Sequence, residues 1–373
     1  MIYLHVGLGK CGSSTIQHTA SYQAEALRAA GVNYPALVGH LPEQHKPLAD
    51  FLLARLKRPG LDMPAPISAF HGELSANPNQ DFLLSSEYFL GRSQARASAM
   101  ANGLREFLGE APVLVLIYIR EYPAWVESLY AQRTKRGENT DDMDAFIRNR
   151  DIVNAISMVT ALRAWMQVFG ADNIRLRSLS RSNLVGGDLI SDLLAAMGVD
   201  ASLPAIERVN ESPPWPVLEL ARDIASRRPD GTTATLTLYR GWLKRLVTEA
   251  TAALKIADVA PPKPQYLNQA DWAGLRDAYN SDVAQINQML PNHAVPLMEG
   301  PVIGERGRVP SIRNIPEEAL EVCVRAIAQG TAFQRMPTAM REAVRPTLRA
   351  GRRKLRRAAA GGTQPPTADP ARP

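Results

Sequence analysis

A glycine-rich turn followed by three hydroxyl residues holds the side chains of this sequence best suited to chemistry. The turn reads GLGKCG over residues 7–12, and SST follows it directly. Turn N–H groups, a lysine ammonium and a helix N-terminus all attract anions. Helix capping alone needs one serine and no lysine. The stretch therefore predicts a phosphate or sulfate site, and the residues expected at the anion are Lys10, Cys11, Gly12, Ser13, Ser14 and Thr15.

Two known phosphate-binding patterns fit this turn only in part. The turn satisfies G-x-G-x-x-G, but a dinucleotide fold also wants an acid at the end of its second strand. Residues 32–34 read VNY and offer no carboxylate there. The Walker pattern wants lysine directly before Ser or Thr, whereas Lys10 precedes Cys11. The hydroxyl that holds Mg²⁺ in P-loop enzymes is thus missing beside the lysine, which favours anion chemistry without a metal.

A second anion-binding pair is expected where the apolar run VLVLIYI ends. Arg120 follows that run, and Ser128 lies eight residues later on the expected next helix. Ligands bind at the carboxyl ends of strands in open α/β sheets, and arginine can contact a phosphate with two donors. Arg120 and Ser128 can therefore converge on one anion. The alternative is a surface ion pair between Arg120 and the neighbouring Glu121.

The elements that position these residues alternate between strand and helix in the first half of the chain. The run 113–119 is apolar throughout, as in a parallel strand covered on both faces. The pattern predicts an α/β three-layer sandwich with a central parallel sheet, followed by a helical half. We expect strands at 2–6, 81–85, 113–119 and 174–179, a loop at 57–80, and helices at 13–30, 93–108, 123–136, 152–169, 184–197, 217–226, 236–254, 271–289 and 317–329.

Together, the two anion-binding stretches resemble the sulfotransferases that use 3′-phosphoadenosine-5′-phosphosulfate (PAPS). That family carries a 5′-phosphosulfate loop of the type P-K-[ST]-G-[ST]-[ST], here GKCGSST over residues 9–15. It also carries an arginine followed eight residues later by a serine, both on the 3′-phosphate, here Arg120 and Ser128. The segment YIREYPAWVESLYAQRTKRG is similar in sequence to bacterial members of the family that sulfate carbohydrates or other surface metabolites. Two positions depart from the family: Cys11 stands in place of Ser or Thr, and Gly9 in place of the common Pro.

The resemblance covers roughly residues 1–215 and implies both a fold and an activity. The implied fold is the P-loop-like fold of sulfotransferases. The implied activity is in-line transfer of a sulfuryl group from PAPS, without a metal, to a hydroxyl or amine of a small-molecule or glycan acceptor such as a carbohydrate or glycolipid. Adenosine 3′,5′-bisphosphate (PAP) is the product. Lys10 would then stabilise charge on the bridging oxygen as PAP leaves.

A base must take the proton of the acceptor, and two residues are candidates. Glu87 follows the strand DFLLS, at the position expected to lie beside the turn. Carbohydrate-active members of the family often use glutamate, so Glu87 is the first choice for the base. His5 lies on the first strand, two residues before the turn, and is the rival catalytic residue.

Composition and charge limit the partners and the location. The net charge is +6, but residues 341–357 hold eight basic side chains and one acid, so the rest of the chain is nearly neutral. This distribution argues against a nucleic-acid partner. The segment is either a solvated basic helix or an attachment to anionic lipid head groups. Beyond it the chain ends in Ala, Gly, Thr and Pro, and we expect residues 331–373 to form a basic, disordered tail.

The sequence also carries no signal for secretion or membrane insertion. No run of about 18 apolar residues occurs, and a strand is expected from Ile2 where a secretory signal would need an apolar core. Cys11 and Cys323 are too few for a disulfide framework or a dedicated zinc site. We therefore expect a cytoplasmic protein, with the inner face of the membrane as the place where the tail could attach.

The expected organisation is one sulfotransferase domain over residues 1–330, with an α/β core at 1–210 and a helical cap at 211–330. Two other functions stay open at this point. A P-loop-type nucleotide kinase would need ATP and Mg²⁺. A non-catalytic nucleotide-binding module would bind nucleotide without transferring any group.

Overall fold

The computed structural model of the protein describes residues 1–36, 44–91, 93–149, 157–203, 212–228, 232–262, 264, 266–290, 295–298 and 310–361. The chain forms two compact units, neither of them continuous in sequence. Unit 1 comprises Met1–Trp125, Arg150–Asn210 and Ala273–Pro301, and unit 2 comprises Val126–Asn149, Glu211–Trp272 and Val302–Pro373. Residues 126–149 belong to the helical unit and residues 273–301 to the α/β unit, so neither unit follows the chain as one continuous stretch.

Unit 1 is built on a five-stranded sheet whose strands are all parallel. The strand order is β2-β3-β1-β4-β5, with β1 at the centre. His5 pairs with Ser85 on one side and with Leu116 on the other. The predicted α/β architecture with a central parallel sheet is therefore confirmed. The strands are β1 Ile2–His5, β2 Val32–Asn33, β3 Asp81–Ser85, β4 Val113–Ile119 and β5 Ile174–Ser178.

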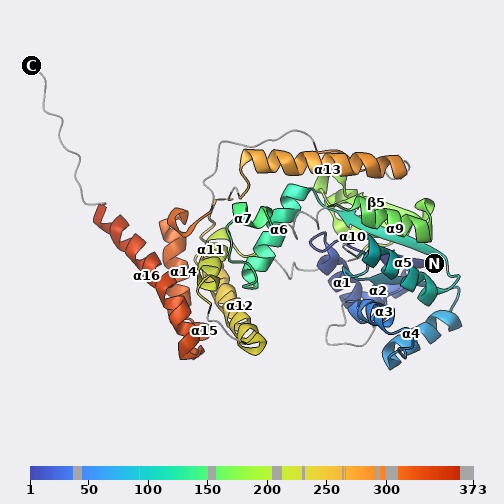
Figure 1. The fold of residues 1–373 in the computed structure, drawn as a ribbon, viewed down its shortest axis with the longest axis horizontal. Helices are drawn as coiled ribbons and strands as arrows, with labels where there is room; N and C mark the ends of the chain where they lie inside the picture. Colours follow the sequence, from blue (N-terminus) through green and yellow to red (C-terminus); the bar gives the residue numbers. More distant parts are fainter. Residues whose placement is uncertain are drawn as a thin grey trace, which may run out of the picture. The chain divides into compact units, whose positions relative to one another are not determined.

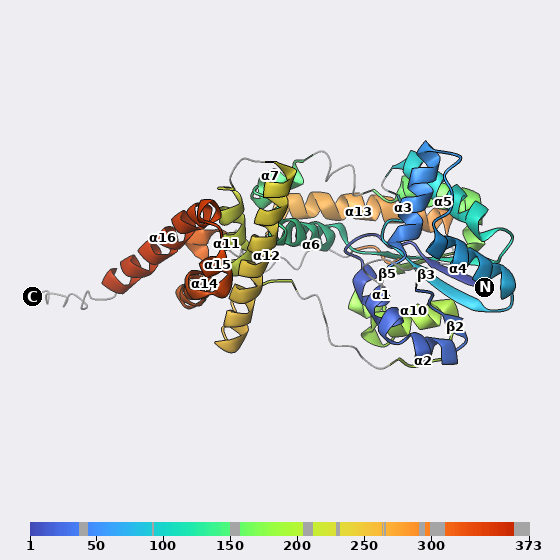
Figure 2. The same cartoon turned by 90° about the horizontal axis from the view of Figure 1, so that it is seen from below.

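Helices cover both faces of this sheet. In Figure 2, α3 and α5 lie on one side of the strands, and α1 and α10 lie on the other. α5 packs on α3 and α9 in the first layer, and α1 packs on α10 in the second. The helices of unit 1 are α1 Ser13–Tyr22, α2 Ala24–Ala29, α3 Lys46–Lys57, α4 Ala65–Ala76, α5 Gln94–Leu108, α9 Val159–Phe169 and α10 Leu189–Met197, with short 3-10 turns η1 Ala171–Asn173, η2 Arg181–Asn183 and η3 Val185–Gly187.

A buried polar cluster fixes α10 against the sheet. Asp192, on α10, accepts a hydrogen bond from the Tyr118 hydroxyl at 2.8 Å and pairs with the guanidinium of Arg177 from β5. Because these partners favour the ionised carboxyl, they hold the pKa of Asp192 below its usual range despite the cost of burial. The cluster places Leu189, at the start of α10, against the turn that follows β1.

Three sequence predictions differ from the observed elements. The expected loop at 57–80 contains α4, which has Pro66 in its first turn, where proline favours a helix start rather than a break. The expected helix 13–30 is interrupted at Gln23, whose backbone leaves the helical region. The expected helix 184–197 begins only at Leu189, because the Asp188 carboxylate caps it there. The first residues of the expected helix 152–169 lie outside the described residues.

Unit 2 is helical in its described part. Figure 1 shows α14, α15 and α16 together at the C-terminal end of the colour scale, and α14 packs against both α12 and α16. The helices of this unit are α7 Met143–Ile147, α11 Trp215–Ala225, α12 Thr233–Ile256, α14 Glu317–Gln329, α15 Thr331–Arg335 and α16 Thr338–Gly361, with the 3-10 turn η5 Ile312–Asn314. Two helices, α6 Tyr122–Lys135 and α13 Gln269–Met289, contribute residues to both units.

The predicted disorder of the tail is wrong over residues 331–361, which form α15 and α16. Val344, Thr347, Leu348 and Gly351 lie on one face of α16 and are buried. This apolar stripe at helical spacing is hidden among the basic residues in the sequence, and its burial stabilises the helix. Residues 362–373 lie outside the described residues. No helix in the described ranges combines the length and the apolar character needed to cross a membrane.

Candidate functional site

Three of the predicted site segments follow three neighbouring strands of the sheet. After β1 the chain builds β3 on one side of it and β4 on the other. In parallel sheets, ligands bind outside the carboxyl ends of strands where the strand order changes direction in this way. The turn at 7–12 follows β1, Glu87 follows β3, and Arg120 follows β4. The topology therefore brings these three segments to one edge of unit 1.

The turn itself is tight and strained. Gly7, Lys10 and Gly12 all have positive φ, at 27°, 73° and 85°. Glycine is favoured at position 12 because its φ is positive and because a Cβ there would lie 2.4 Å from a methyl carbon of Leu189. Lys10 is not a glycine, and the left-handed conformation costs such a residue about 1–2 kcal/mol. Strain of this kind concentrates at functional sites, and here it falls on the predicted catalytic lysine.

The N-terminus of α1 is open to an anion. The first backbone hydrogen bond of the helix runs from the Ile16 N–H to the Gly12 carbonyl at 3.1 Å, so the N–H groups of Ser13, Ser14 and Thr15 precede the helical ladder. Gly12 supplies no side-chain cap, and the first turn has no acidic residue. Ser14 and Thr15 are exposed, whereas Ser13 is buried. Because the first turn of α1 provides neither a cap nor an acidic side chain, the positive end of the helix dipole can attract an anionic ligand.

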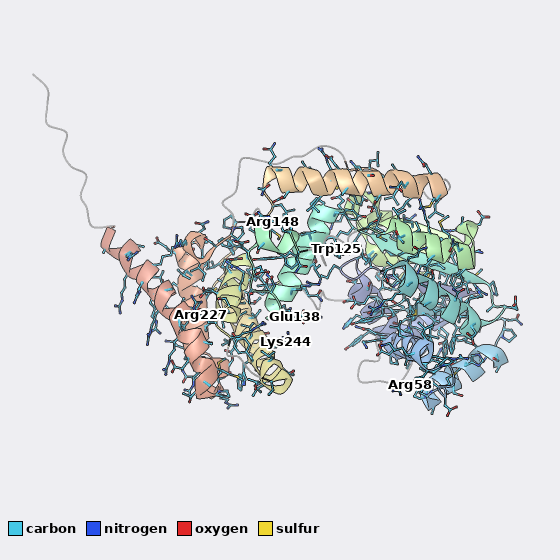
Figure 3. The ribbon with its side chains drawn as sticks, viewed as in Figure 1. Arg58, Trp125, Glu138, Arg148, Arg227 and Lys244 are labelled. Carbon is cyan, nitrogen blue, oxygen red and sulfur yellow. The ribbon has the colours of Figure 1, made fainter. Side chains whose placement is uncertain are left out.

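Two contacts hold the turn from the protein side. The indole Nε1–H of Trp125 (labelled in Figure 3) donates to the Gly9 carbonyl at 2.9 Å. The N–H of Cys11 donates to the Leu8 carbonyl at 3.0 Å, and its thiol is buried against the backbone of Arg120. Burial raises the pKa of this thiol to about 12. Cys11 therefore lies beneath the turn and positions it, which differs from the expected contact with the anion.

Glu87 lies beside the turn. Its side chain is partly exposed, and a Cβ on Gly9 would stand 3.2 Å from its Oε2 atom. The carboxylate is therefore next to the residue that precedes Lys10. This position suits a base that acts on a group held at the turn.

His5 is also close to the turn, but it is wholly buried. Its Nδ1 lies 2.7 Å from the Ser85 hydroxyl oxygen. Its Nε2 has no hydrogen-bond partner among the described residues and lies near Gly7, where a Cβ would be 3.3 Å away. Burial lowers the pKa of His5 to about 3, so the imidazole is neutral and a weak base at neutral pH. This environment disfavours His5 as the base and leaves Glu87 as the better-placed candidate.

His45 is a site-supporting residue that no sequence signal singled out. Its Nδ1 accepts a hydrogen bond from the Ser85 N–H at 2.8 Å, and its Nε2 lies 2.8 Å from the Pro35 carbonyl oxygen. These bonds fix the end of β3 two residues before Glu87. Burial lowers the pKa of His45 to about 4, so the neutral imidazole makes both contacts. No local pattern marks this residue, because its role depends on Ser85, which lies 40 residues away in the sequence.

Arg120 stands at the carboxyl end of β4 and is partly exposed. Although Glu121 follows it, Arg120 forms no ion pair with a carboxylate in the described ranges, which removes the surface-pair alternative. Ser128 lies on α6 and is also partly exposed. Arg120 belongs to unit 1 and Ser128 to unit 2, so their joint contact with one anion stays a prediction.

The predicted site residues thus separate into two groups. Lys10, Ser14, Thr15, Glu87 and Arg120 lie on segments at one edge of the sheet with side chains at least partly exposed, whereas His5, Cys11 and Ser13 are buried beneath the turn. We find no match of this chain to a family model, to a curated protein or to a solved structure. The chemistry of the site is therefore inferred from its own geometry.

Proposed function

We propose that the protein is a sulfotransferase that transfers a sulfuryl group from PAPS to a hydroxyl or amine of a carbohydrate or glycolipid, and that unit 1 has the P-loop-like fold of such enzymes. One observation carries the proposal. The uncapped N-terminus of α1, with Lys10 held in a left-handed conformation beside it, lies at the same sheet edge as Glu87 and Arg120.

The residues present fit both anionic ends of the donor. The N–H groups of residues 13–15 and the hydroxyls of Ser14 and Thr15 would hold the 5′-phosphosulfate. Arg120, which has no ion pair among the described residues, would bind the 3′-phosphate through two guanidinium donors. The buried Nε2 of His5, without a partner in the described part of the chain, lies directly beneath the turn. A proton on this atom would give the turn one further donor.

The chain's own residues can carry out the steps of the transfer. When bound, PAPS supplies the sulfuryl group, whose bond to the bridging phosphate oxygen breaks as the bond to the acceptor forms, so that PAP leaves. Glu87 takes the proton from the acceptor hydroxyl. Lys10 stabilises the negative charge that develops on the bridging oxygen. The turn holds Lys10 in place because Trp125 and the buried Cys11 anchor it on both sides.

The cytoplasm is our proposed location for this reaction. Both cysteines are buried free thiols, which is consistent with a reducing compartment.

Turnover of PAPS to PAP in the presence of a panel of sugar and lipid-linked acceptors tests the function. We expect PAP to form together with a sulfated acceptor identified by mass spectrometry, and EDTA to leave the rate unchanged. Turnover of ATP that depends on Mg²⁺, without turnover of PAPS, would support the kinase instead. Binding of PAP without transfer to any acceptor would indicate a non-catalytic module.

A further inference from the structure

The last helix of the chain, α16, carries a dense array of exposed arginines. Eight basic residues lie between positions 341 and 357 of this helix. Six of them are exposed, and we call this set the arginine face. Its members are Arg345, Arg349, Arg352, Arg353, Arg356 and Arg357.

Helical geometry aligns the arginine face on one side of α16. Four of its members, at positions 345, 349, 352 and 356, fall within about 60° of one another around the helix axis. Arg353 and Arg357 widen the face to one side. Positions 345 to 357 span about 18 Å along the axis. The face is therefore a band two side chains wide rather than a single file.

The arrangement is unfavourable for the helix by itself. Like charges three or four residues apart destabilise a helix, and the face contains six such pairs. Only Arg345 has an acidic partner in the described ranges, Glu342. Lys354, by contrast, turns away from the face and donates to the Ile315 carbonyl. The stability of the fold does not account for this accumulation of charge, which points to an anionic ligand.

The other side of α16 is occupied by the protein. The Thr347 hydroxyl donates to Asp223 at 2.6 Å, and a Cβ on Gly351 would lie 2.7 Å from a methyl carbon of Val324 on α14. Beyond Gly351 no residue of the helix up to residue 360 is fully buried. Figure 2 shows this C-terminal half of α16 extending past α14. The first half of α16 therefore fixes the helix to the rest of unit 2, and the second half exposes the arginine face to solvent.

We propose that the arginine face of α16 binds the surface of a membrane that contains anionic phospholipids. Guanidinium groups pair with phosphates through two donors, and clustered basic residues on a helix are attracted to anionic head groups. The interaction is peripheral and does not depend on the proposed sulfuryl transfer.

Two features favour a lipid surface over a polymeric anion. Proteins that bind single-stranded nucleic acid present aromatic side chains for base stacking, and residues 341–357 contain no aromatic residue. A band two arginines wide also matches a plane of head groups better than one extended chain.

Sedimentation of the full-length protein with phospholipid vesicles tests the proposal. The protein should bind vesicles of phosphatidylcholine with phosphatidylglycerol, should not bind vesicles of phosphatidylcholine alone, and should be released by added salt. Replacing the last four arginines with glutamine should lower the partition coefficient roughly tenfold or more, because each basic residue contributes separately. The four changes are Arg352→Gln, Arg353→Gln, Arg356→Gln and Arg357→Gln.

A matched variant separates the arginine face from total charge. It removes the same charge from exposed positions of unit 1, through Arg28→Gln, Lys57→Gln, Arg58→Gln and Arg181→Gln. This control should bind anionic vesicles like the wild type, and both variants should melt within a few degrees of the wild type. Equal loss of binding in both variants would overturn the proposal. So would binding to RNA or to an acidic polysaccharide without binding to the vesicles.

Discussion

The indole Nε1–H of Trp125 donates a hydrogen bond to the carbonyl oxygen of Gly9 at 2.9 Å. This bond joins the first turn of α6 to the turn that precedes α1, although 116 residues separate the two in sequence. Trp125 follows Arg120 by five residues, and Gly9 is next to Lys10. The bond therefore ties the segment that would bind the 3′-phosphate to the turn that would hold the phosphosulfate.

Trp125→Phe removes this donor and keeps an aromatic ring in the core. We expect PAP to bind about five- to tenfold more weakly, because an anchoring hydrogen bond contributes about 1 kcal/mol and the turn loosens without it. Isothermal titration measures the change. Trp165→Phe is the matched control, since Trp165 is equally buried and donates to the Leu90 carbonyl at 3.0 Å. Equal losses of affinity in the two variants would mean that Trp125 acts only through general stability.

Lys10 can be tested with two substitutions that separate its ammonium from its backbone. Lys10→Ala and Lys10→Gly both remove the charge, and both should lower the rate of transfer about 10²- to 10³-fold. Lys10→Gly should also be the more stable protein by about 1 kcal/mol, because glycine adopts the positive φ of 73° without strain. Rate assays and thermal denaturation together check the pair. A Lys10→Gly variant that keeps its transfer rate would exclude the ammonium from the chemistry.

Arg120→Ala should mainly weaken nucleotide binding. The expected loss for PAP is about 2–4 kcal/mol if the guanidinium pairs with a desolvated phosphate. Affinity for adenosine 5′-phosphosulfate, which lacks the 3′-phosphate, should change much less. Arg163→Ala, at an exposed position on α9, serves as the control. If Arg120→Ala weakened both nucleotides equally, Arg120 would not be at the 3′-phosphate.

Glu87→Gln replaces the proposed basic carboxylate with an amide of similar shape. We expect the transfer rate to fall about 10²- to 10⁴-fold and PAP affinity to stay within a factor of about two. His5→Gln should lower the melting temperature, because the buried bond to Ser85 is disturbed. At a temperature where it is folded, however, it should keep most of the transfer rate. A reversal of these two outcomes would make His5 the base.

The buried histidines predict how stability depends on pH. In the folded protein the pKa of His5 is lowered to about 3 and that of His45 to about 4, from 6.5. Below pH 6.5 the unfolded chain takes up protons that the folded protein does not bind, so the free energy of unfolding falls as pH drops from 6.5 to 4. The slope is about 1.4 kcal/mol per pH unit for each histidine.

Denaturant titrations between about pH 7 and pH 4, which cover the pH range in which an unfolded histidine titrates, measure this slope. In His45→Gln, the slope of the free energy of unfolding against pH should decrease by the contribution of one proton, since glutamine can replace both hydrogen bonds without titrating. An unchanged slope in His45→Gln would show that His45 is not buried as a neutral group.

The sequence predicted the parts of unit 1 that depend on local pattern. Strands β3 and β4 have the expected bounds, since uninterrupted apolar runs bounded by turns identify buried strands. The placement of Lys10, Glu87 and Arg120 after parallel strands followed from the same pattern. The sequence could not show that Cys11 turns inward, because its burial depends on tertiary packing that brings its thiol to the backbone of Arg120, far along the chain.

The parts that were missed depend on distant partners. His45 contacts Ser85 and Pro35, and no local pattern marks it. The helix α16 was expected to be disordered because its arginines dominate the composition, while its apolar face packs on residues far along the chain, such as Val324 and Leu320 on α14. The assignment of residues 126–149 to unit 2 likewise depends on tertiary contacts, such as Gly137 against Leu243.

The most direct test of the central claim is a calorimetric titration of the full-length protein with PAP in the presence of EDTA, compared with ATP in the presence of Mg²⁺. We expect one PAP site per chain, weakened by Arg120→Ala, and little or no binding of ATP. Absence of PAP binding to well-folded protein, or tight binding of ATP that requires Mg²⁺, would contradict the assignment of the turn at residues 7–12 to a phosphosulfate.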